Sequence, residues 1–467
     1  MTGQERAWRA CFSPVDIASV VVFRVAFGAI MLWEVTRYFD HGWIDRYFIA
    51  PTFHFTYFGF GWVQPWPGNG MYFHFLGLGL LAICVMAGAW YRVSAALFFI
   101  GFTYVFLLDQ TQYLNHFYLI SLVSFLLVLI PAHHAVSVDA WRRPSLASDT
   151  APAWALWMLR FQIGLVYLYG GIAKVGSDWL RGEPMRSWLA DEGGFPLIGR
   201  FLTQEWAVWA FSYGGLLFDL LVVPALLWRR TRVMAFVATL AFHLTNAQMF
   251  SIGIFPWMMI AATTLFFPPS WPRALGRGLA GAKAAARGRR PRKKAPVVAP
   301  PARVVTSPAR MALVGGLCVF VLLQVFVPFR HLLYPGVANW TEEGHRFSWH
   351  MKLRDKDGDA WFAVTEPASG RRWEIDPHIY LTDRQVRKMS ARPDMILQFS
   401  HHLAELWAED GDGQRVEVRA DVMASLNDRP HRRYIDPTVD LAAQPRTLAS
   451  VDWILPLDNQ PVATSRR

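Results

Sequence analysis

Long apolar stretches recur along the chain and set the strongest limit on its fold. A membrane-spanning helix needs about 20 consecutive, mostly apolar residues. The chain is 53% hydrophobic and only 17% charged, whereas soluble domains carry about 25% charged residues. The sequence therefore predicts a polytopic α-helical membrane protein with about nine spans, at 15–36, 71–90, 93–108, 114–131, 153–173, 206–228, 232–248, 251–267 and 309–328.

Basic residues in the connecting segments predict how these helices are oriented. Lysine and arginine are enriched on the cytoplasmic side of membrane proteins. Residues 272–310 hold 11 Lys and Arg and no acidic residue. The loops that the nine spans place on the opposite side of the membrane hold few basic residues. We therefore expect a cytoplasmic N-terminus and an extracytoplasmic C-terminal region. The expected location is the plasma or inner membrane, or the endoplasmic reticulum membrane in a eukaryote.

The basic stretch at 272–308 also raises the question of nucleic-acid binding. It is rich in Ala, Gly and Pro and contains no aromatic residue. This composition is typical of a disordered linker that is attracted to anionic lipid headgroups. We therefore predict membrane lipids as a partner of this stretch, and no nucleic acid.

The hydropathy falls after Arg330, and a different pattern begins. Alternating residues around Asp-Gly and Ser-Gly turns at 347–377 predict a β-meander, and 414–426 predicts another strand. Apolar residues at helical spacing over 382–410, interrupted by Pro393, predict two helices or one kinked helix. We expect a transmembrane domain at 1–271, the basic linker at 272–308, a last transmembrane helix at 309–330 and a small extracytoplasmic α+β domain at 331–467.

Polar residues lie at the ends of three spans that the predicted topology brings to the outer face. They belong to the fourth span, the end of the fifth, and the junction of the seventh and eighth: Asn115 with His116, Lys174, and His243 with Asn246 and Gln248. Polar and ionisable residues inside a membrane are costly and often mark functional sites. Their convergence predicts one site at the outer face.

Each of these residues also has a structural interpretation. His116 could be an interfacial histidine with satisfied hydrogen bonds, His243 a structural donor, and Lys174 a residue that snorkels toward water. Gly170 and Gly171, which precede the lysine, could simply allow close helix packing. If Lys174 is instead a general base, burial would favour its neutral amine. Such a base suits a moderately acidic, lipid-soluble substrate such as a phenol or hydroquinone.

Six stretches, in this order, carry a resemblance that extends from about Val15 to about Asp440. They are "FLLDQTQYLNHFYL", "IGLVYLYGGIAKVGSDW", "FHLTNAQMFSIGIF", "PPSWPRAL", "NWTEEGHRFSWHMK" and "SLNDRPHRRYIDPTVDL". They resemble the vitamin K-dependent γ-glutamyl carboxylase family, whose membrane part is of the HTTM type. The resemblance implies a lyase that couples epoxidation of vitamin K hydroquinone or menaquinol to γ-carboxylation of polypeptide glutamate. It implies O2 and CO2 as co-substrates and no metal.

The resemblance also implies roles for single residues. Lys174 matches the lysine that deprotonates the quinol, His116 matches the histidine that supports this step, and Asn115 matches its neighbour. We expect the quinol or the polypeptide substrate to be bound by a further set of residues: Asn115, His243, Asn246, Gln248, Trp340 and Trp349. For Trp349, packing of the C-terminal domain onto the membrane part is the structural alternative.

Two other functions stay open at this stage. The chain could epoxidise or oxidise a quinol while acting on a different target. It could also be a transporter or scaffold without enzymatic activity. The sequence shows no internal inverted repeat, which counts against a transporter.

Overall fold

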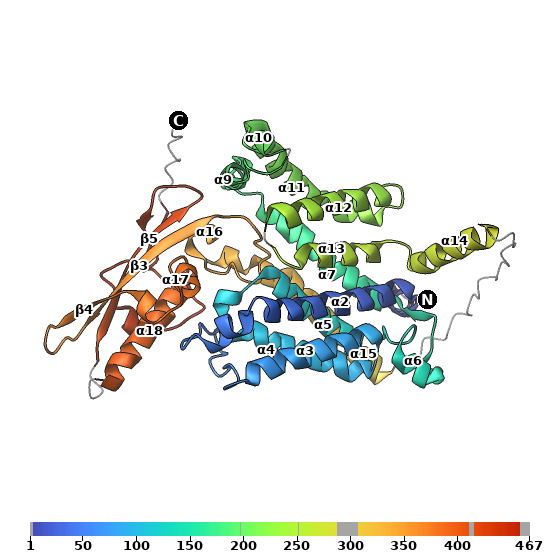
Figure 1. The fold of residues 1–467 in the computed structure, drawn as a ribbon, viewed down its shortest axis with the longest axis horizontal. Helices are drawn as coiled ribbons and strands as arrows, with labels where there is room; N and C mark the ends of the chain where they lie inside the picture. Colours follow the sequence, from blue (N-terminus) through green and yellow to red (C-terminus); the bar gives the residue numbers. More distant parts are fainter. Residues whose placement is uncertain (1–2, 197, 251, 287–306, 411–414, 458–467) are drawn as a thin grey trace.

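The computed structural model describes residues 3–196, 198–250, 252–286, 307–410 and 415–457. They form a bundle of long helices with a mixed α and β domain at one end (Figure 1). The N-terminus lies at the opposite end of the bundle, near α6 (Val138–Arg142) and α14 (Trp271–Ala286). The C-terminal domain and the N-terminus are therefore separated by the length of the bundle.

Six helices of the described chain are long and apolar enough to cross a membrane. They are α2 (Ala18–Asp40), α3 (Gly70–Ala87), α4 (Tyr91–Leu108), α7 (Ala153–Ala173), α11 (Glu205–Leu227) and α15 (Pro308–Phe326), whose apolar stretch continues to Leu333. The other three predicted spans coincide with α5 (Asn115–Leu129), α12 (Arg232–Met249) and α13 (Phe255–Thr263). Of these, α5 and α13 are short and α12 is less apolar, so the polytopic helical fold is confirmed and the count of nine crossings stays a prediction.

The predicted basic linker differs in part from the structure. Its first half continues as the helix α14, which ends at Ala286. Alanine is the strongest helix former, and it dominates the end of this segment. Residues 287–306 lie outside the described residues, so the expected disorder of the linker stays a prediction there.

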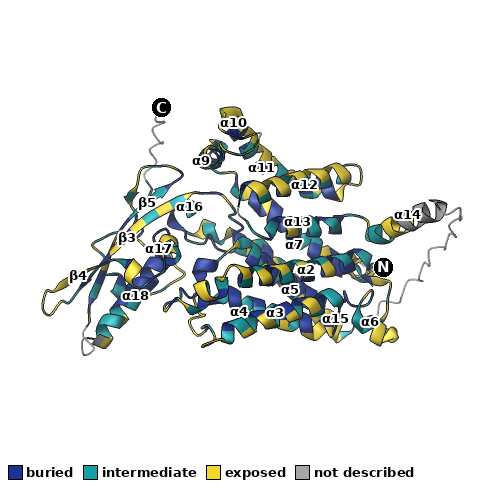
Figure 2. Ribbon diagram, in the orientation of Figure 1, coloured by how far each residue is buried: buried dark blue, intermediate teal, exposed yellow. Residues whose placement is uncertain are grey.

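Exposed residues lie along the outer helices of the bundle (Figure 2), and many of them are large and apolar. Phe73 and Leu80 on α3, Ile100 on α4 and Leu217 on α11 are each more than half exposed. Soluble proteins rarely expose large contiguous apolar patches. In a bilayer these side chains contact lipid, so the exposed surface agrees with the membrane-spanning assignment.

The C-terminal domain is a four-stranded antiparallel sheet that packs against two helices. The strand order is β4-β3-β5-β6, built from β3 (Lys356–Thr365), β4 (Arg372–Ile375), β5 (Glu417–Leu426) and β6 (Arg432–Arg433). The stretch that predicts two helices or a kink forms α17 (Asp383–Met389) and α18 (Pro393–Asp410). Alternate residues of the strands, such as Phe362 and Val422, face the helices and bury a core around Phe399.

Short elements complete the bundle. Two short strands pair antiparallel: β1 (Pro14–Asp16) and β2 (Thr150–Pro152). The helix α1 (Gly3–Phe12) precedes the first long helix, and three helices follow α7: α8 (Ser177–Leu180), α9 (Met185–Asp191) and α10 (Gly199–Leu202). A further helix, α16 (Ala338–Thr341), leads into the C-terminal domain. The region of α8 to α10 packs onto the start of α11.

Buried polar contacts fix the C-terminal domain to the bundle. Asp178 in α8 accepts hydrogen bonds from Arg429 at 2.6 and 2.8 Å and from Asn427 at 2.8 Å. Burial alone would raise the pKa of the Asp178 carboxyl, but Arg429 and Asn427 outweigh burial and lower it. The backbone N–H of Thr56 donates to Gln398 at 2.9 Å on another side of the contact. The two parts of the molecule therefore meet through specific, charge-assisted contacts.

Candidate active site

Lys174 lies at the C-terminal end of α7 and is buried, with 6% of its surface exposed. Its ammonium group donates one hydrogen bond to a carboxylate oxygen of Asp219 on α11 and another, at 3.3 Å, to the carbonyl oxygen of Gly170. The ring of Trp179 lies 5.3 Å from Nζ. Lys174 does not snorkel toward water, because its charged end is paired inside the protein.

Two glycines bring α7 and α11 together at this ion pair. A Cβ atom at Gly171 would lie 2.6 Å from Cδ2 of Leu220, and one at Gly170 would lie 3.2 Å from Oδ2 of Asp219. Small residues at such positions let helices approach closely. The close-packing interpretation of the glycines is therefore correct, and this packing is what places Lys174 against Asp219.

Asp219 is absent from the residues predicted from the sequence, although its signal is visible there. It is the only charged residue of α11 after Glu205. A carboxylate inside an apolar span is a functional candidate by default. The prediction considered only the burial of Lys174. The structure adds Asp219 as a carboxylate partner of its ammonium group.

The two predicted histidines lie on either side of one aromatic ring. The ring centroids of His116 and His243 lie 5.9 and 6.0 Å from that of Phe255 on α13. Nε2 of His243 is 2.7 Å from the hydroxyl of Tyr167, which lies two turns before Lys174 on α7. Helices α5, α7, α12 and α13 thus bring His116, His243 and Tyr167 together around Phe255, and Tyr167 shares α7 with Lys174.

Asn115 contacts the C-terminal domain rather than Lys174. Its side-chain amide donates to the carbonyl oxygen of His350 at 3.0 Å and accepts a hydrogen bond from Tyr113 at 3.0 Å. The Tyr113 hydroxyl in turn accepts from the backbone N–H of Phe347 at 2.7 Å. The start of α5 therefore holds residues 342–353, which we call the inserted segment.

The inserted segment carries Trp349 into the core of the bundle. Trp349 is fully buried, and its ring centroid lies 5.0 Å from that of Tyr118 on α5. Trp349 and Phe347 have φ values of 58° and 64°, a conformation that costs roughly 1–3 kcal/mol for a non-glycine residue. The surrounding packing maintains this backbone, so the segment forms a fixed wall of the site.

In the described part of the chain, three predicted residues make no hydrogen bond or ring contact with Lys174. Trp340 belongs to the core of the C-terminal domain, where its indole N–H donates to the carbonyl oxygen of Leu455 at 2.7 Å and its ring lies 5.1 Å from Nζ of Lys356. Asn246 is half-buried and Gln248 is exposed, and the described residues give neither side chain a hydrogen bond. Gln248 lies five residues after His243 and points about 140° away around α12, whereas Asn246, three residues after it, lies within about 60° of the same direction. Gln248 therefore faces away from His243, and a binding role of Asn246 and Trp340 stays a prediction.

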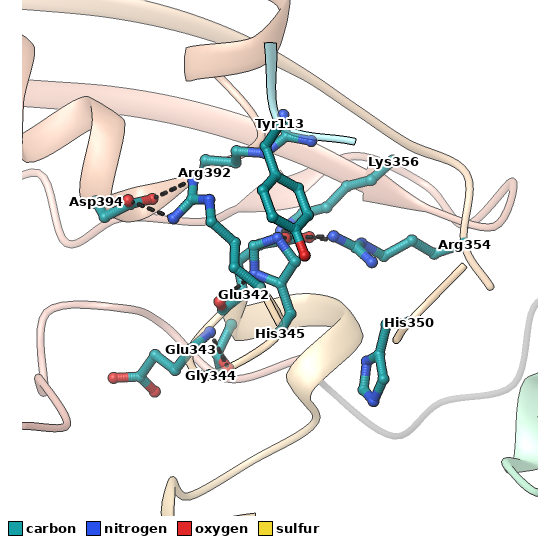
Figure 3. Close-up of polar contacts among 12 residues, drawn as sticks. Tyr113, Glu342, Glu343, Gly344, His345, His350, Arg354, Lys356, Arg392 and Asp394 are labelled. Carbon is teal, nitrogen blue, oxygen red and sulfur yellow. Dashed lines mark hydrogen bonds and ion pairs between the residues drawn. The ribbon is translucent and has the colours of Figure 1, made fainter. Parts of the chain in front are cut away.

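A second buried polar group surrounds Glu342 in the C-terminal domain (Figure 3). Arg354 donates two hydrogen bonds to the Glu342 carboxylate, and Nε2 of His345 lies 3.1 Å and Nζ of Lys356 3.7 Å from it. Burial raises the pKa of Glu342, but Arg354, His345 and Lys356 outweigh burial and hold it well below its usual range. Burial lowers the pKa of Lys356 to about 7. Arg354 and Lys356 thus share one carboxylate, beside His345, whose pKa burial holds well below its usual range.

The bundle places aromatic rings and a buried ion pair among these helices. The ring of Phe255 lies 5.9 Å from that of His116 and 6.0 Å from that of His243, and Lys174 pairs with Asp219. The buried Nδ1 of His243 and Nε1 of Trp349 lack hydrogen-bond partners among the described residues and suit the oxygen atoms of a quinol ring. The described chain contains no group of three or more His, Cys, Asp or Glu residues placed to hold a metal ion.

Comparison with known families agrees with this arrangement. Residues 12–271 match the family model of the HTTM domain, and residues 309–460 match that of the vitamin K-dependent gamma-carboxylase, lumenal domain. No solved structure matches the chain. The two family matches cover the bundle and the C-terminal domain in chain order, and with the apolar helices they indicate a membrane protein with an extracytoplasmic domain. The chain belongs to the vitamin K-dependent γ-carboxylase family.

Proposed function

We propose that this protein is a γ-glutamyl carboxylase that couples quinol epoxidation to carboxylation of polypeptide glutamate. The observation that carries the proposal is the buried Lys174–Asp219 pair, which lies two turns along α7 from Tyr167 and its partner His243. An amine has a reference pKa near 10.4, which is too low to deprotonate a carbon beside a carboxylate. A bound vitamin K hydroquinone or menaquinol, together with O2, supplies the stronger base, and CO2 is the carboxyl donor.

The residues of the chain then have separate tasks. Nζ of Lys174 takes a proton from a quinol hydroxyl. His116 stabilises the charge that develops there, and His243 is held by its hydrogen bond to Tyr167 to contact the quinol oxygen or ring. Trp349 closes the site on the side of the C-terminal domain and excludes water.

The second polar group suits the polypeptide side of the reaction. Arg354 and Lys356 give the Glu342 cluster an excess of positive charge, which attracts an acidic polypeptide. The inserted segment joins this cluster to the bundle site, so the two half-reactions meet across one stretch of chain. The quinol enters from lipid and the glutamate from the extracytoplasmic side.

The test uses the purified full-length protein with vitamin K hydroquinone, labelled CO2 and a Glu-containing peptide. A snorkelling or structural lysine needs only its charge, whereas a base needs an amine that can lose its proton. Arginine remains protonated in proteins. We therefore expect Lys174→Arg and Lys174→Ala to abolish epoxidation and carboxylation while the protein still inserts into membranes.

The matched control is Lys388→Arg, the same exchange at a lysine of α17 in the C-terminal domain, which should leave both products unchanged. Near-normal epoxidation by Lys174→Arg would remove the base assignment. In the wild type, epoxide without labelled peptide would favour a quinol epoxidase with another target. The absence of both products would favour a transporter or scaffold.

The proposed orientation has its own test. We propose that the N-terminus is cytoplasmic, because the basic α14 and the N-terminus share the end of the bundle opposite the C-terminal domain (Figure 1). Reporter fusions at the N-terminus and after residue 457 should report opposite sides of the membrane. Both reporters on one side would contradict this orientation.

A further inference from the structure

The Lys174–Asp219 pair presents a problem for a lysine base. Both side chains are buried, with 8% and 7% of their surfaces exposed. A carboxylate in direct contact stabilises the ammonium form over the free amine, and a general base must lack the proton that it is to accept. A proton that reaches Nζ of Lys174 therefore has a second acceptor, the Asp219 carboxylate, in direct hydrogen-bond contact.

The Asp219 carboxylate has few other interactions. The described residues give it no hydrogen-bond donor other than Lys174. The other titratable side chain on which its charge acts is Tyr167, whose hydroxyl contacts His243. A buried charge that loses its partner is strongly destabilising. The ammonium and the carboxylate are therefore expected to change charge together rather than singly.

We propose that Asp219 is the final acceptor of the proton that Lys174 takes from the quinol. This inference rests on the proposed function. An O–H bond of the quinol hydroxyl breaks while an N–H bond forms at Nζ of Lys174. Another N–H bond of the same ammonium breaks while an O–H bond forms at the Asp219 carboxylate. The electron pair of the broken O–H bond stays on the quinol oxygen, so no net charge is created.

This exchange suits a site from which water is excluded. A neutral lysine acting alone would separate two new charges in apolar surroundings, which is costly. Here the negative charge moves from the carboxylate to the quinol oxygen, and the Lys174 ammonium remains beside it as a preorganised cation. In water a carboxylate is far too weak a base for a phenol. In this site the Lys174 ammonium stabilises the Asp219 carboxylate before the transfer and the quinol anion after it. The ammonium therefore narrows the difference in base strength between the carboxylate and the quinol oxygen.

The packing around the pair supports a relay with a fixed geometry. Trp179, which lies over Nζ, donates a hydrogen bond from its indole N–H to the carbonyl oxygen of Ser212 on α11 at 2.8 Å. Gly170 leaves the space that the Asp219 carboxylate occupies. Lys174 and Asp219 are thus held by the same two helices. Asp219 acts through Lys174 and is a positioning and proton-holding residue.

The decisive comparison is between Asp219→Asn and Asp219→Glu in the purified full-length protein. Asparagine keeps an oxygen that can accept a hydrogen bond from Nζ but cannot take up a proton. We expect Asp219→Asn to lower vitamin K hydroquinone epoxidation at least 100-fold at every pH, in line with the usual size of general acid–base effects. Asp219→Glu should restore at least a tenth of the wild-type rate.

The opposite result has a clear form. If Lys174 is the base by itself, loss of the carboxylate makes its amine easier to deprotonate. Asp219→Asn would then stay active, and its pH profile would move to lower pH, which would overturn the proposal. Glu205→Gln, the same chemical change at the exposed start of α11, is the matched control and should leave the profile unchanged. Tyr167→Phe tests whether the neighbouring hydroxyl contributes to the profile.

Two measurements do not depend on turnover. Without quinol, an amine-reactive reagent should modify Lys174 faster in Asp219→Asn than in the wild type at the same pH, because the ammonium has lost its counter-ion. Equal rates would overturn the proposal. Under anaerobic conditions, addition of vitamin K hydroquinone should produce the infrared band of a protonated carboxylic acid in the wild type and not in Asp219→Asn. A wild-type spectrum without this band would also overturn it.

The outcomes separate this inference from the proposed function. Active Lys174→Arg would refute the base assignment itself. Inactive Lys174→Arg together with active Asp219→Asn would refute only the relay. Elution of each variant on size-exclusion chromatography and its thermal unfolding exclude a simple loss of structure, and Asp219→Glu provides a second variant if Asp219→Asn does not fold.

Discussion

The two buried groups of charges in this molecule are built in different ways. In the bundle, one ammonium faces one carboxylate among apolar helices. In the C-terminal domain, Arg354, His345 and Lys356 surround the single carboxylate of Glu342. An isolated pair can lose both charges by moving one proton, whereas the Glu342 carboxyl, whose pKa its partners hold well below the usual range, stays ionised. The comparison indicates that the first group is suited to transfer a proton and that the second keeps its carboxylate charged, while Lys356 with its pKa of about 7 can still titrate.

The largest expected effect separates the two groups by activity. His116→Ala should lower quinol epoxidation by about 10²–10⁴-fold, the usual range when a hydrogen-bonding or acid–base group is lost. The stability of the C-terminal domain should not change, because His116 lies at the bundle site. Epoxide formation and thermal unfolding are measured on the same preparation.

The control for this change is His378→Ala, at an exposed histidine of the C-terminal domain. Unchanged epoxidation in folded His116→Ala would assign a structural role to His116. It would also weaken the view that chemistry is confined to the bundle.

The next change should affect the stability of the C-terminal domain rather than the chemistry in the bundle. Glu342→Gln removes the shared carboxylate and leaves Arg354 and Lys356 buried without their counter-ion. Breaking a buried ion pair in this way costs about 3–5 kcal/mol. We expect faster amide hydrogen exchange in β3 and β5 of the full-length protein. Glu366→Gln, in an exposed turn, should not change the exchange, and a stable Glu342→Gln would show that the cations do not need this partner.

A smaller effect tests the helix contact that creates the bundle pair. The Cβ atom of Gly171→Ala would lie 2.6 Å from the Leu220 side chain and 3.1 Å from its backbone nitrogen. Such overpacking costs about 1–3 kcal/mol, so the thermal unfolding temperature and the epoxidation rate should fall together. Gly214→Ala on α11, where a Cβ atom meets no neighbour, is the control. Equal behaviour of the two variants would mean that α7 and α11 tolerate a wider separation.

The smallest expected effect, counted per pH unit, is the pH dependence of stability. Burial lowers the pKa of Lys356 to about 7 from its ordinary value of 10.5. Between these pH values the unfolded chain binds more protons than the folded one, so the free energy of unfolding rises with pH by up to about 1.4 kcal/mol per unit. Below about pH 7 the contribution of Lys356 to the free energy of unfolding no longer changes with pH, and the folded state is then least stable with respect to this group.

Denaturation midpoints of the full-length protein across this range measure that slope. Lys356→Met should reduce it by the contribution of one proton. Lys388, whose pKa burial also lowers to about 7, contributes in the same direction and remains in the variant. An unchanged slope in Lys356→Met would assign the whole effect to other groups.

The sequence predicts the helices better than the partners of their polar residues. The predicted fifth span coincides with α7, because an apolar run and its charged end are local properties. Asp219 lies 45 residues from Lys174, and their contact depends on how two helices pack. The same limit applies to Glu342, whose partners come from the turn after α16 and the start of β3. The position of Trp340 beside Lys356 depends in the same way on the packing of the C-terminal domain.

The inserted segment has a consequence for how this architecture can be divided. The chain leaves the apolar span by Leu333, yet Trp349 returns to complete the interior of the bundle. The end of the apolar span is therefore not the boundary of the core of the bundle. A chimera joined at Leu333 would replace the segment that carries Trp349 together with the outer domain. One joined after Leu353 would keep that segment, but it would also keep Trp340 and Glu342, which belong to the core and the charge group of the outer domain.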